Sequence, residues 1–170
     1  TAPQDTYDIT AEVRALKPGT GWRRALAADA GLPETFEQLA LEMTLGFDAP
    51  WDRAALEQRR PQPRQIELRL ADAQWGDLRL KAAGALSVDE SGLPEGEIAL
   101  QAENWRGMVA MAEQGGVLPP ALRRSVERVL ELLSRTGGNP QHLNITLGFR
   151  GGYVTLGPLP LGPAPRLILR

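Results

Sequence analysis

Hydrophobic and polar residues alternate along several stretches of this chain, and alternation with a period of two predicts β-strands. In residues 8–14, Ile9, Ala11 and Val13 share one face, while the side chains between them are charged or carry a hydroxyl. The same alternation recurs in the ranges 37–47, 65–71, 76–88, 97–103, 142–150 and 153–156. Each predicted strand thus has one aliphatic and one wet face; in residues 65–71 the aliphatic face is expected to carry Ile66, Leu68 and Leu70.

Three stretches have helical spacing instead. Residues 22–30 follow the capping candidates Thr20 and Gly21. A short helix is expected after Trp105, and apolar residues recur every three or four positions in residues 120–135. Strands that pair with their chain neighbours and carry one apolar face should curve around such helices. We therefore predict an α+β fold in which duplicated strand–helix–strand units form a curved antiparallel sheet, with about three helices packed on it.

An internal repeat underlies this prediction. Residues 41–47 and 143–149 share Leu, Thr, Leu, Gly and Phe at matching positions, and a Trp-Arg pair precedes each copy. Duplicated units are typical of architectures built from copies. The charged, proline-containing connector of residues 60–64 suggests a first half over residues 1–60 and a second half over residues 61–170, together forming one continuous domain.

Composition excludes several classes of function. The 170-residue chain has a net charge of −2, which gives no bulk attraction to nucleic acid, and no cysteine, which excludes disulfides and thiol chemistry. The longest uncharged stretch, residues 151–165, contains four prolines and cannot form a membrane-spanning helix. We find no nucleophile elbow and no phosphate-binding loop. The sequence therefore predicts no cofactor, no metal site and no nucleic-acid partner.

The two Trp-Arg pairs are the first candidate site. Trp22, Arg23, Trp105 and Arg106 lie at predicted strand-to-helix junctions. In a structural role, each indole fills a corner of the core while its N–H donates to a backbone carbonyl. In a functional role, the pairs would bind the anionic headgroup of a hydrophobic ligand.

The proline-rich end is the second candidate. Pro158, Pro160, Pro163 and Pro165 impose an extended backbone that lacks N–H donors. As a structural strap, this segment would pack Leu159, Leu161 and Leu167 along a sheet edge and protect it. As a docking peptide, its prolines would contact a partner protein.

Catalytic chemistry has little support in the residues. His142 is the only histidine, and it falls on the polar phase of its strand. Glu67, Asp77, Glu97 and Glu103 could supply paired carboxylates for a hydrolase, but they alternate with Arg and Lys, which favours a solvated, salt-bridged surface. We predict that the protein is not an enzyme.

Several segments resemble a known family. They are the strand that begins at Gly76, the turn Gly92–Gly96, the Asn104-Trp105-Arg106 junction and the proline-rich residues 157–165. Over roughly residues 35–167 the chain is similar to the domain of unknown function 2125 family of alphaproteobacterial envelope proteins. Members usually begin with a hydrophobic segment, so the resemblance implies the exported C-terminal portion of a longer protein. It also implies a periplasmic location with an inner-membrane anchor, and it carries over no catalytic residue.

Two functional hypotheses follow. The first is a non-enzymatic periplasmic module whose curved sheet offers an apolar groove to a lipid or another hydrophobic ligand. The second is an envelope scaffold that binds another envelope protein through its proline-rich strap. In either case, contact with the membrane would depend on an N-terminal segment outside this sequence.

Overall fold

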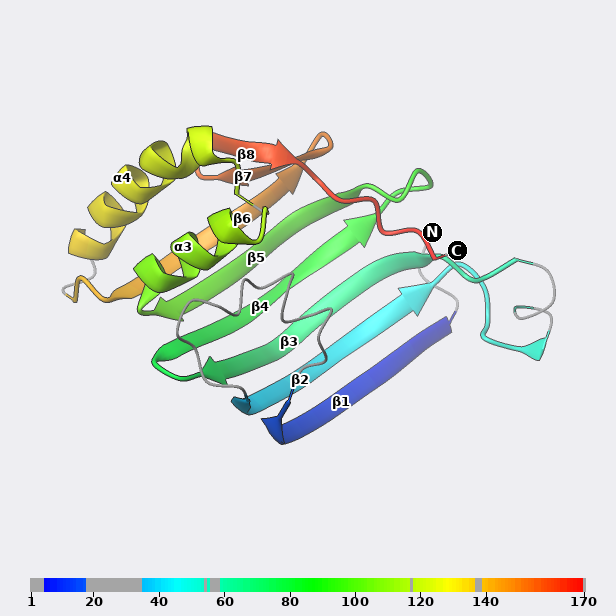
Figure 1. Ribbon diagram of the computed structural model, residues 1–170. Helices are drawn as coiled ribbons and strands as arrows, with labels where there is room; N and C mark the ends of the chain where they lie inside the picture. Colours follow the sequence, from blue (N-terminus) through cyan, green and yellow to red (C-terminus); the bar gives the residue numbers. More distant parts are fainter. Residues whose placement is uncertain are drawn as a thin grey trace.

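The strands form one curved antiparallel sheet in which every strand pairs with its neighbours in the chain. The computed structural model describes residues 5–17, 35–53, 55, 59–116, 118–136 and 139–169. The sheet has the order β1-β2-β3-β4-β5-β6-β7-β8 (Figure 1). Its strands are β1 (Asp5–Leu16), β2 (Phe36–Phe47), β3 (Pro63–Trp75), β4 (Leu78–Val88), β5 (Pro94–Glu103), β6 (His142–Arg150), β7 (Tyr153–Leu156) and β8 (Leu159–Pro163).

The predicted fold class was wrong. The described residues form a single eight-stranded sheet, and their two complete helices, α3 (Trp105–Gln114) and α4 (Pro120–Thr136), both lie between β5 and β6. The repeated sequence encodes two strands of this sheet, β2 and β6, rather than two strand–helix–strand units. Strands that share one apolar face can all join one sheet, so the repeat implies no helix of its own. The helix predicted for residues 22–30 lies outside the described residues.

Strand register lines up the aliphatic residues in rows across the sheet. One row runs from Ala11 through Leu41, Ala71, Ala82 and Leu100 to Ile145. The neighbouring row on the other face is polar and runs from Glu12 through Ala40, Asp72, Lys81 and Gln101 to Asn144. The sheet is therefore aliphatic on its concave face and polar on its convex face, as the alternation predicted.

One side chain breaks the predicted pattern. The pairing of β2 with β3 shifts by one residue between Glu42 and Met43, where β3 carries a bulge. Leu70 pairs with Glu42 and thus lies on the polar face, whereas Leu68 pairs with Met43 on the aliphatic face. The expectation that Leu70 shares a face with Leu68 was wrong, because one extra residue in a strand reverses the direction of every later side chain.

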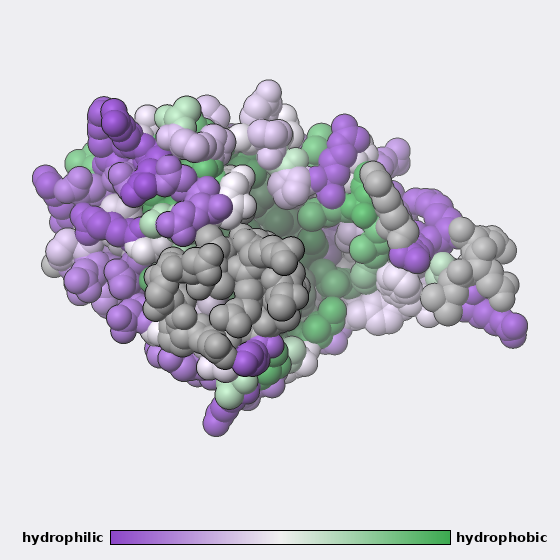
Figure 2. Space-filling view, viewed as in Figure 1, coloured by the Kyte–Doolittle hydropathy of each residue, from purple (hydrophilic) through white to green (hydrophobic). Residues whose placement is uncertain are grey.

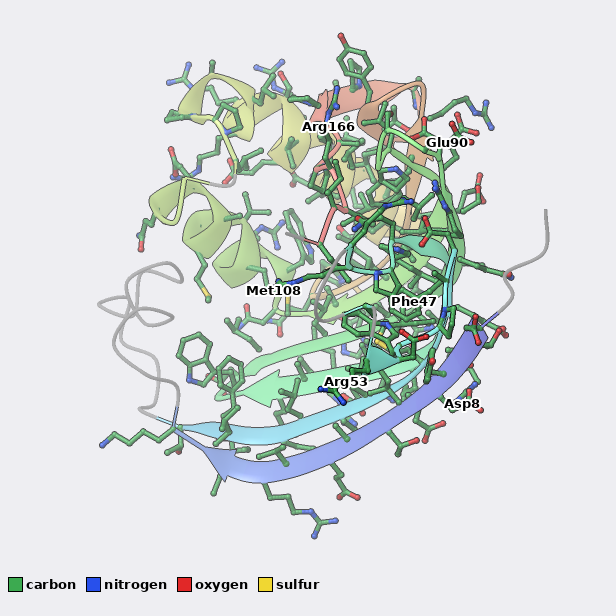
Figure 3. The ribbon with its side chains drawn as sticks, turned by 90° about the vertical axis from the view of Figure 1, so that its right-hand side faces the viewer. Asp8, Phe47, Arg53, Glu90, Met108 and Arg166 are labelled. Atoms are coloured by element: carbon green, nitrogen blue, oxygen red, sulfur yellow. The ribbon has the colours of Figure 1, made fainter. Side chains whose placement is uncertain are left out.

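Both helices pack on one end of the concave face. Trp105 and Val109 of α3 and Val126 and Leu130 of α4 form a core with Leu143 of β6. The partly buried residues around this core extend it to β4 and β8, and none of its residues comes from β1, β2 or β3. In the view along the sheet, the helices lie inside its curve and Asp8 lies outside it (Figure 3).

The chain after β8 crosses the ends of other strands. From here on, the name strap is kept for residues 164–169, the part of the proline-rich end that follows β8. The backbone N–H of Ala164 donates to Gly152 O at 2.8 Å, and that of Leu167 donates to Gly92 O at 2.8 Å. At its end, Leu169 exchanges two 3.0 Å hydrogen bonds with the side chain of Gln62. The strap thus ties the turns at one end of the sheet together (Figure 1).

Candidate functional site: an apolar groove on the concave face

Among the described residues, the core cluster around the helices takes no side chain from the concave face of β1, β2 and β3, where Phe47 and Trp75 at the strand ends are 6% and 4% exposed. We call this surface the apolar groove, and its residues are Tyr7, Ile9, Val13, Leu39, Leu41, Met43, Leu45, Ile66 and Leu68. The β1 side chains remain 36–38% exposed, and those of β2 and β3 are half-buried. The space-filling view shows a hollow on this side of the molecule, and hydrophobic residues line its visible part (Figure 2).

Aromatic side chains lie at both ends of the groove strands. Where β2 ends, Phe47 makes edge contacts with Tyr7 at 5.8 Å and with Trp51 at 5.6 Å between ring centroids. Trp51 is 41% exposed, and its backbone N–H donates to the Tyr7 hydroxyl at 3.1 Å. At the opposite end, Phe36 stacks on Trp75 at 4.4 Å. Rings in these positions reduce solvent access at the groove ends. The side chains between the two ends are aliphatic or methionine.

Guanidinium groups gather next to the Phe47 end. Asp48 accepts hydrogen bonds from Arg59 at 2.8 Å, from Arg64 at 3.2 Å and from the backbone N–H of Gln62 at 2.7 Å. Burial acts to raise the pKa of Asp48, but the Gln62 hydrogen bond and the two arginines outweigh it and hold the pKa below its ordinary value. The carboxylate of Asp48 thus forms ion pairs with two guanidinium groups. Arg53 lies on the inner side of the sheet near Phe47 (Figure 3).

The Trp-Arg pair that the structure describes is built into the core. Trp105 is 2% exposed, and its indole N–H donates to Pro140 O at 3.0 Å, as the structural interpretation predicted. Arg106 lies over the Trp105 ring at 4.5 Å from its centroid, and its Nη2 is 4.0 Å from Glu131 Oε1. This pair is not at the apolar groove. The other predicted pair, Trp22 and Arg23, lies outside the described residues.

The proline candidates all lie on the surface. Pro158 is in the turn before β8, Pro160 and Pro163 are in β8, and Pro165 is in the strap. All four are exposed, while Leu159 and Leu161 pack against the core cluster. The structure therefore supports a protected edge here, and partner binding by these prolines stays a prediction.

The convex face carries the polar candidates. His142 lies opposite Glu103, and Ala85 separates Glu67 from Glu97 in the register. Two strand spacings put those two Cα atoms about 10 Å apart. A hollow of about 520 Å³ on this side is lined by charged and amide side chains: Gln74, Asp77, Arg79, Glu103, Asn104, Gln141 and His142.

Some of the charged groups on this face form ion pairs. Arg79 binds Asp72 through two hydrogen bonds, of 3.2 and 2.8 Å, and Lys81 lies 3.9 Å from the same carboxylate. Asp72 is 7% exposed, and chiefly the Arg79 hydrogen bond lowers its pKa. Such a pair stabilises the ionised forms and leaves neither group free to transfer protons at neutral pH. Among the described residues, no group of three or more His, Asp or Glu side chains could hold a metal ion.

Sequence reasoning missed the aromatic cluster at the groove end. Tyr7 is far in sequence from Phe47 and Trp51, and it meets them because β1 and β2 pair antiparallel, with Asp5 opposite Phe47. The alternation of Tyr7 with Ile9 already indicates a shared face. The meeting itself depends on register, which alternation alone does not specify.

Membership of a family follows from a comparison of the whole sequence. No helix in the described part of the chain is long and apolar enough to cross a membrane. Comparison with curated proteins and with solved structures gave no match. A family model does match residues 1–165, essentially the whole chain. The chain therefore belongs to the family described as "Uncharacterized protein conserved in bacteria (DUF2125)".

Proposed function

We propose that this chain is a non-enzymatic periplasmic module that holds the hydrocarbon part of a lipid in its apolar groove. In the full-length protein, an inner-membrane anchor would keep the module near its source of lipid. The observation that carries the proposal is the apolar concave face of β1–β3, which lies outside the core formed by the helices. The envelope location comes from the family resemblance and is part of the proposal.

The chemistry of the groove favours a hydrocarbon chain over a polar ligand. Between Leu39 and Leu45, the concave side chains of β2 and those opposite them on β3 are aliphatic or methionine, and none of them is charged. Transfer of a methylene group from water to such a surface gains about 0.8 kcal/mol. An acyl chain that buries half a dozen methylenes therefore gains several kcal/mol without any directional contact.

The charges at the groove end are compatible with a headgroup. Arg59 and Arg64 share the single carboxylate of Asp48 at this end, while Asp5 lies opposite Phe47 and Arg59 lines a hollow together with Asp89 and Glu90. The exposed ring of Trp51 is in edge contact with Phe47 at this end and has the amphipathic character of residues at membrane interfaces. An acyl chain in the groove could therefore leave an anionic headgroup near the arginines.

Fluorescent fatty-acid binding to delipidated protein tests the proposal. We expect saturable uptake of a polyene fatty acid by the wild-type chain. Leu39→Glu, in the groove, should weaken uptake at least tenfold because it places a charge against the hydrocarbon. Gln38→Glu adds the same side chain at the neighbouring position on the convex face and should leave uptake unchanged.

Two controls complete the experiment. Circular dichroism and thermal unfolding establish that Leu39→Glu is folded at the assay temperature. Phosphatidylglycerol and phosphatidylcholine as competitors then distinguish a preference for anionic headgroups from binding of the acyl chain alone. If the folded wild-type protein takes up none of these probes, the groove does not bind lipid and the proposal is wrong.

A further inference from the structure

The two edges of the sheet are built differently. Edge strand β8 has five residues, contains Pro160 and Pro163, and lies next to the strap. Edge strand β1 has twelve residues, Asp5–Leu16, without a proline, and within the described residues it pairs only with β2. Short, proline-containing edges resist pairing with other chains, whereas a long edge presents a row of unpaired N–H and C=O groups.

We propose that β1 pairs antiparallel with β1 of a second copy of this chain, with Ala11 on the two-fold axis. The sheet would then continue from one copy into the other through the two β1 strands. This dimer goes beyond the proposed function and does not depend on lipid binding.

When two copies of β1 run antiparallel, the side chains that face each other are complementary. With Ala11 opposite Ala11, Ile9 lies opposite Val13 on the concave face, at two places related by the axis. On the convex face, Asp8 lies opposite Arg14, and Thr10 lies opposite Glu12. Ile9 and Val13 are 38% and 36% exposed in the single copy. The side chains of Asp8 and Arg14 are 71% and 79% exposed. Within one copy, Asp8 binds Arg69 and Thr44, and Arg14 binds Glu12, so contacts with a partner strand would add to these pairs or exchange with them. Opposite charges and apolar pairs facing one another across strands each stabilise the pairing.

Neighbouring registers on the same faces are worse. A dyad at Thr10 would put Asp8 opposite Glu12, and a dyad at Glu12 would put two copies of Glu12 face to face. Like charges directly opposite each other destabilise a strand pair. A dyad at Ile9 or Val13 avoids that repulsion but shortens the paired segment. Only the register centred on Ala11 pairs Thr6 through Leu16 without opposing like charges, although Ala15, at φ +54°, interrupts the extended backbone near each end of the paired segment.

Self-pairing also fits the shape of the molecule. The two-fold axis of an antiparallel strand pair within one sheet is perpendicular to that sheet. The concave faces of both copies therefore point the same way. The aliphatic row that ends at Ala11 would continue into the same row of the second copy, through Leu41 and Ala71. Ile9 and Val13, at the open side of the groove, would each gain an apolar neighbour.

Single cysteines test the register directly, because the natural chain has none. Directly opposed residues in an antiparallel pair have Cα atoms about 4.5–5.5 Å apart, within the range that a disulfide bridges. Ala11→Cys should therefore form a disulfide-linked dimer under mild oxidation. Ile9→Cys is the matched control: its two thiols, one from each copy, would be offset by four positions, about 13 Å along the strands, and should not link. Ile9→Cys combined with Val13→Cys should link again.

A charge reversal tests the same pairing without a crosslink. Sedimentation analysis of the wild-type chain should show a concentration-dependent monomer–dimer equilibrium. Arg14→Glu places glutamate opposite Asp8 at both ends and should raise the dimer dissociation constant about tenfold or more. Arg150→Glu makes the same change at an exposed position on β6 and should leave the equilibrium unchanged.

Each outcome decides the proposal. Crosslinking of Ala11→Cys but not of Ile9→Cys, together with dissociation of Arg14→Glu, would support the dimer in this register. A wild-type chain that stays monomeric at all concentrations, with no crosslink at position 11, would overturn it. A dimer that crosslinks through Ile9→Cys instead, or whose dissociation constant is unchanged by Arg14→Glu, would also overturn it. Fatty-acid uptake by monomeric Arg14→Glu, measured separately, tests the groove independently of the dimer.

Discussion

At the scale of single residues, Asp72 shows how the polar face contributes to stability. Its carboxylate is nearly buried and binds the guanidinium of Arg79 through both oxygens. Asp72 and Arg79 lie on neighbouring strands, near the turn that joins β3 to β4. The ion pair therefore fixes the register of this hairpin as well as its charge balance.

The lowered pKa of Asp72 predicts acid sensitivity. Because the folded state lowers this pKa below its ordinary value of 3.8, the stabilisation is complete above about pH 4. It is lost as pH falls through the folded-state pKa. Asp8, Asp48 and Asp89 also have lowered pKa values and contribute in the same range. Urea unfolding measured from pH 7 to pH 2 should thus show a steep loss of stability below pH 4.

Asp72→Asn isolates the contribution of this pair. We expect a loss of about 1–2 kcal/mol at pH 7, at the low end for a charged hydrogen-bonded pair because Arg79 is partly exposed to solvent. Below pH 4 the variant should lose less stability than the wild type. Equal acid dependence in both proteins would show that Asp72 does not titrate as described.

At the scale of elements, the strap makes a close contact with the turn between β4 and β5. Gly92 in that turn has φ = +81°, and a Cβ added there would lie 2.5 Å from Ile168 Cγ1. Asp89 organises the turn: its carboxylate accepts hydrogen bonds from Leu93 and Ser91, which lower its pKa. Strap and turn therefore act as one unit.

A double-mutant cycle measures the free-energy coupling between the strap and this turn. Gly92→Ala should cost about 1–2 kcal/mol from backbone strain, and more because Ile168 must move. In a chain that ends at Pro163, the same substitution should cost only the backbone part. A coupling of about 0.5 kcal/mol or more in urea unfolding would establish the contact, whereas additive effects would show that the strap does not press on Gly92.

The sequence predicted the strands and their faces better than their assembly. Alternation located all strands except β8, whose prolines indicated extended backbone and an edge, and helical spacing over residues 120–135 corresponds to α4. The face of Leu70 and the meeting of Tyr7 with Phe47 were not predictable, because a bulge and the strand register determine them. Alternation shows which side of each strand is apolar. It does not show how many strands join the same sheet.

At the scale of the whole molecule, the described residues divide the concave face into a half that joins the core cluster of the helices and a half that does not. The core lies over β4–β8, and the apolar groove lies over β1–β3. A groove was predicted because the sequence has more aliphatic strand faces than its few helices can cover. Its position depends on where those helices pack. Both helices lie in the connection between β5 and β6, so they cover the strands nearest to that connection.

This division predicts a gradient in amide hydrogen exchange. Amides of β4 and β5 pair on both sides of a strand and should exchange most slowly. Alternate amides of β1 point away from β2 and should exchange fast in dilute wild-type protein. They should become protected as its concentration rises, but not in Arg14→Glu. Protection of these amides at every concentration would mean that another segment already occupies the edge.

Nearest-neighbour strand order also has a consequence for how the chain folds. A strand that pairs only with the next strand in sequence closes a short loop, and short loops cost little chain entropy. The hairpins can form one after another as the chain emerges, without waiting for distant segments. The exceptions are the pairing of β5 with β6 across the two helices and the contacts of the strap, of which that between Gln62 and Leu169 joins residues 107 positions apart. We therefore expect the strap to close last, after a partly folded sheet has already exposed its aliphatic face to any chaperone or membrane nearby.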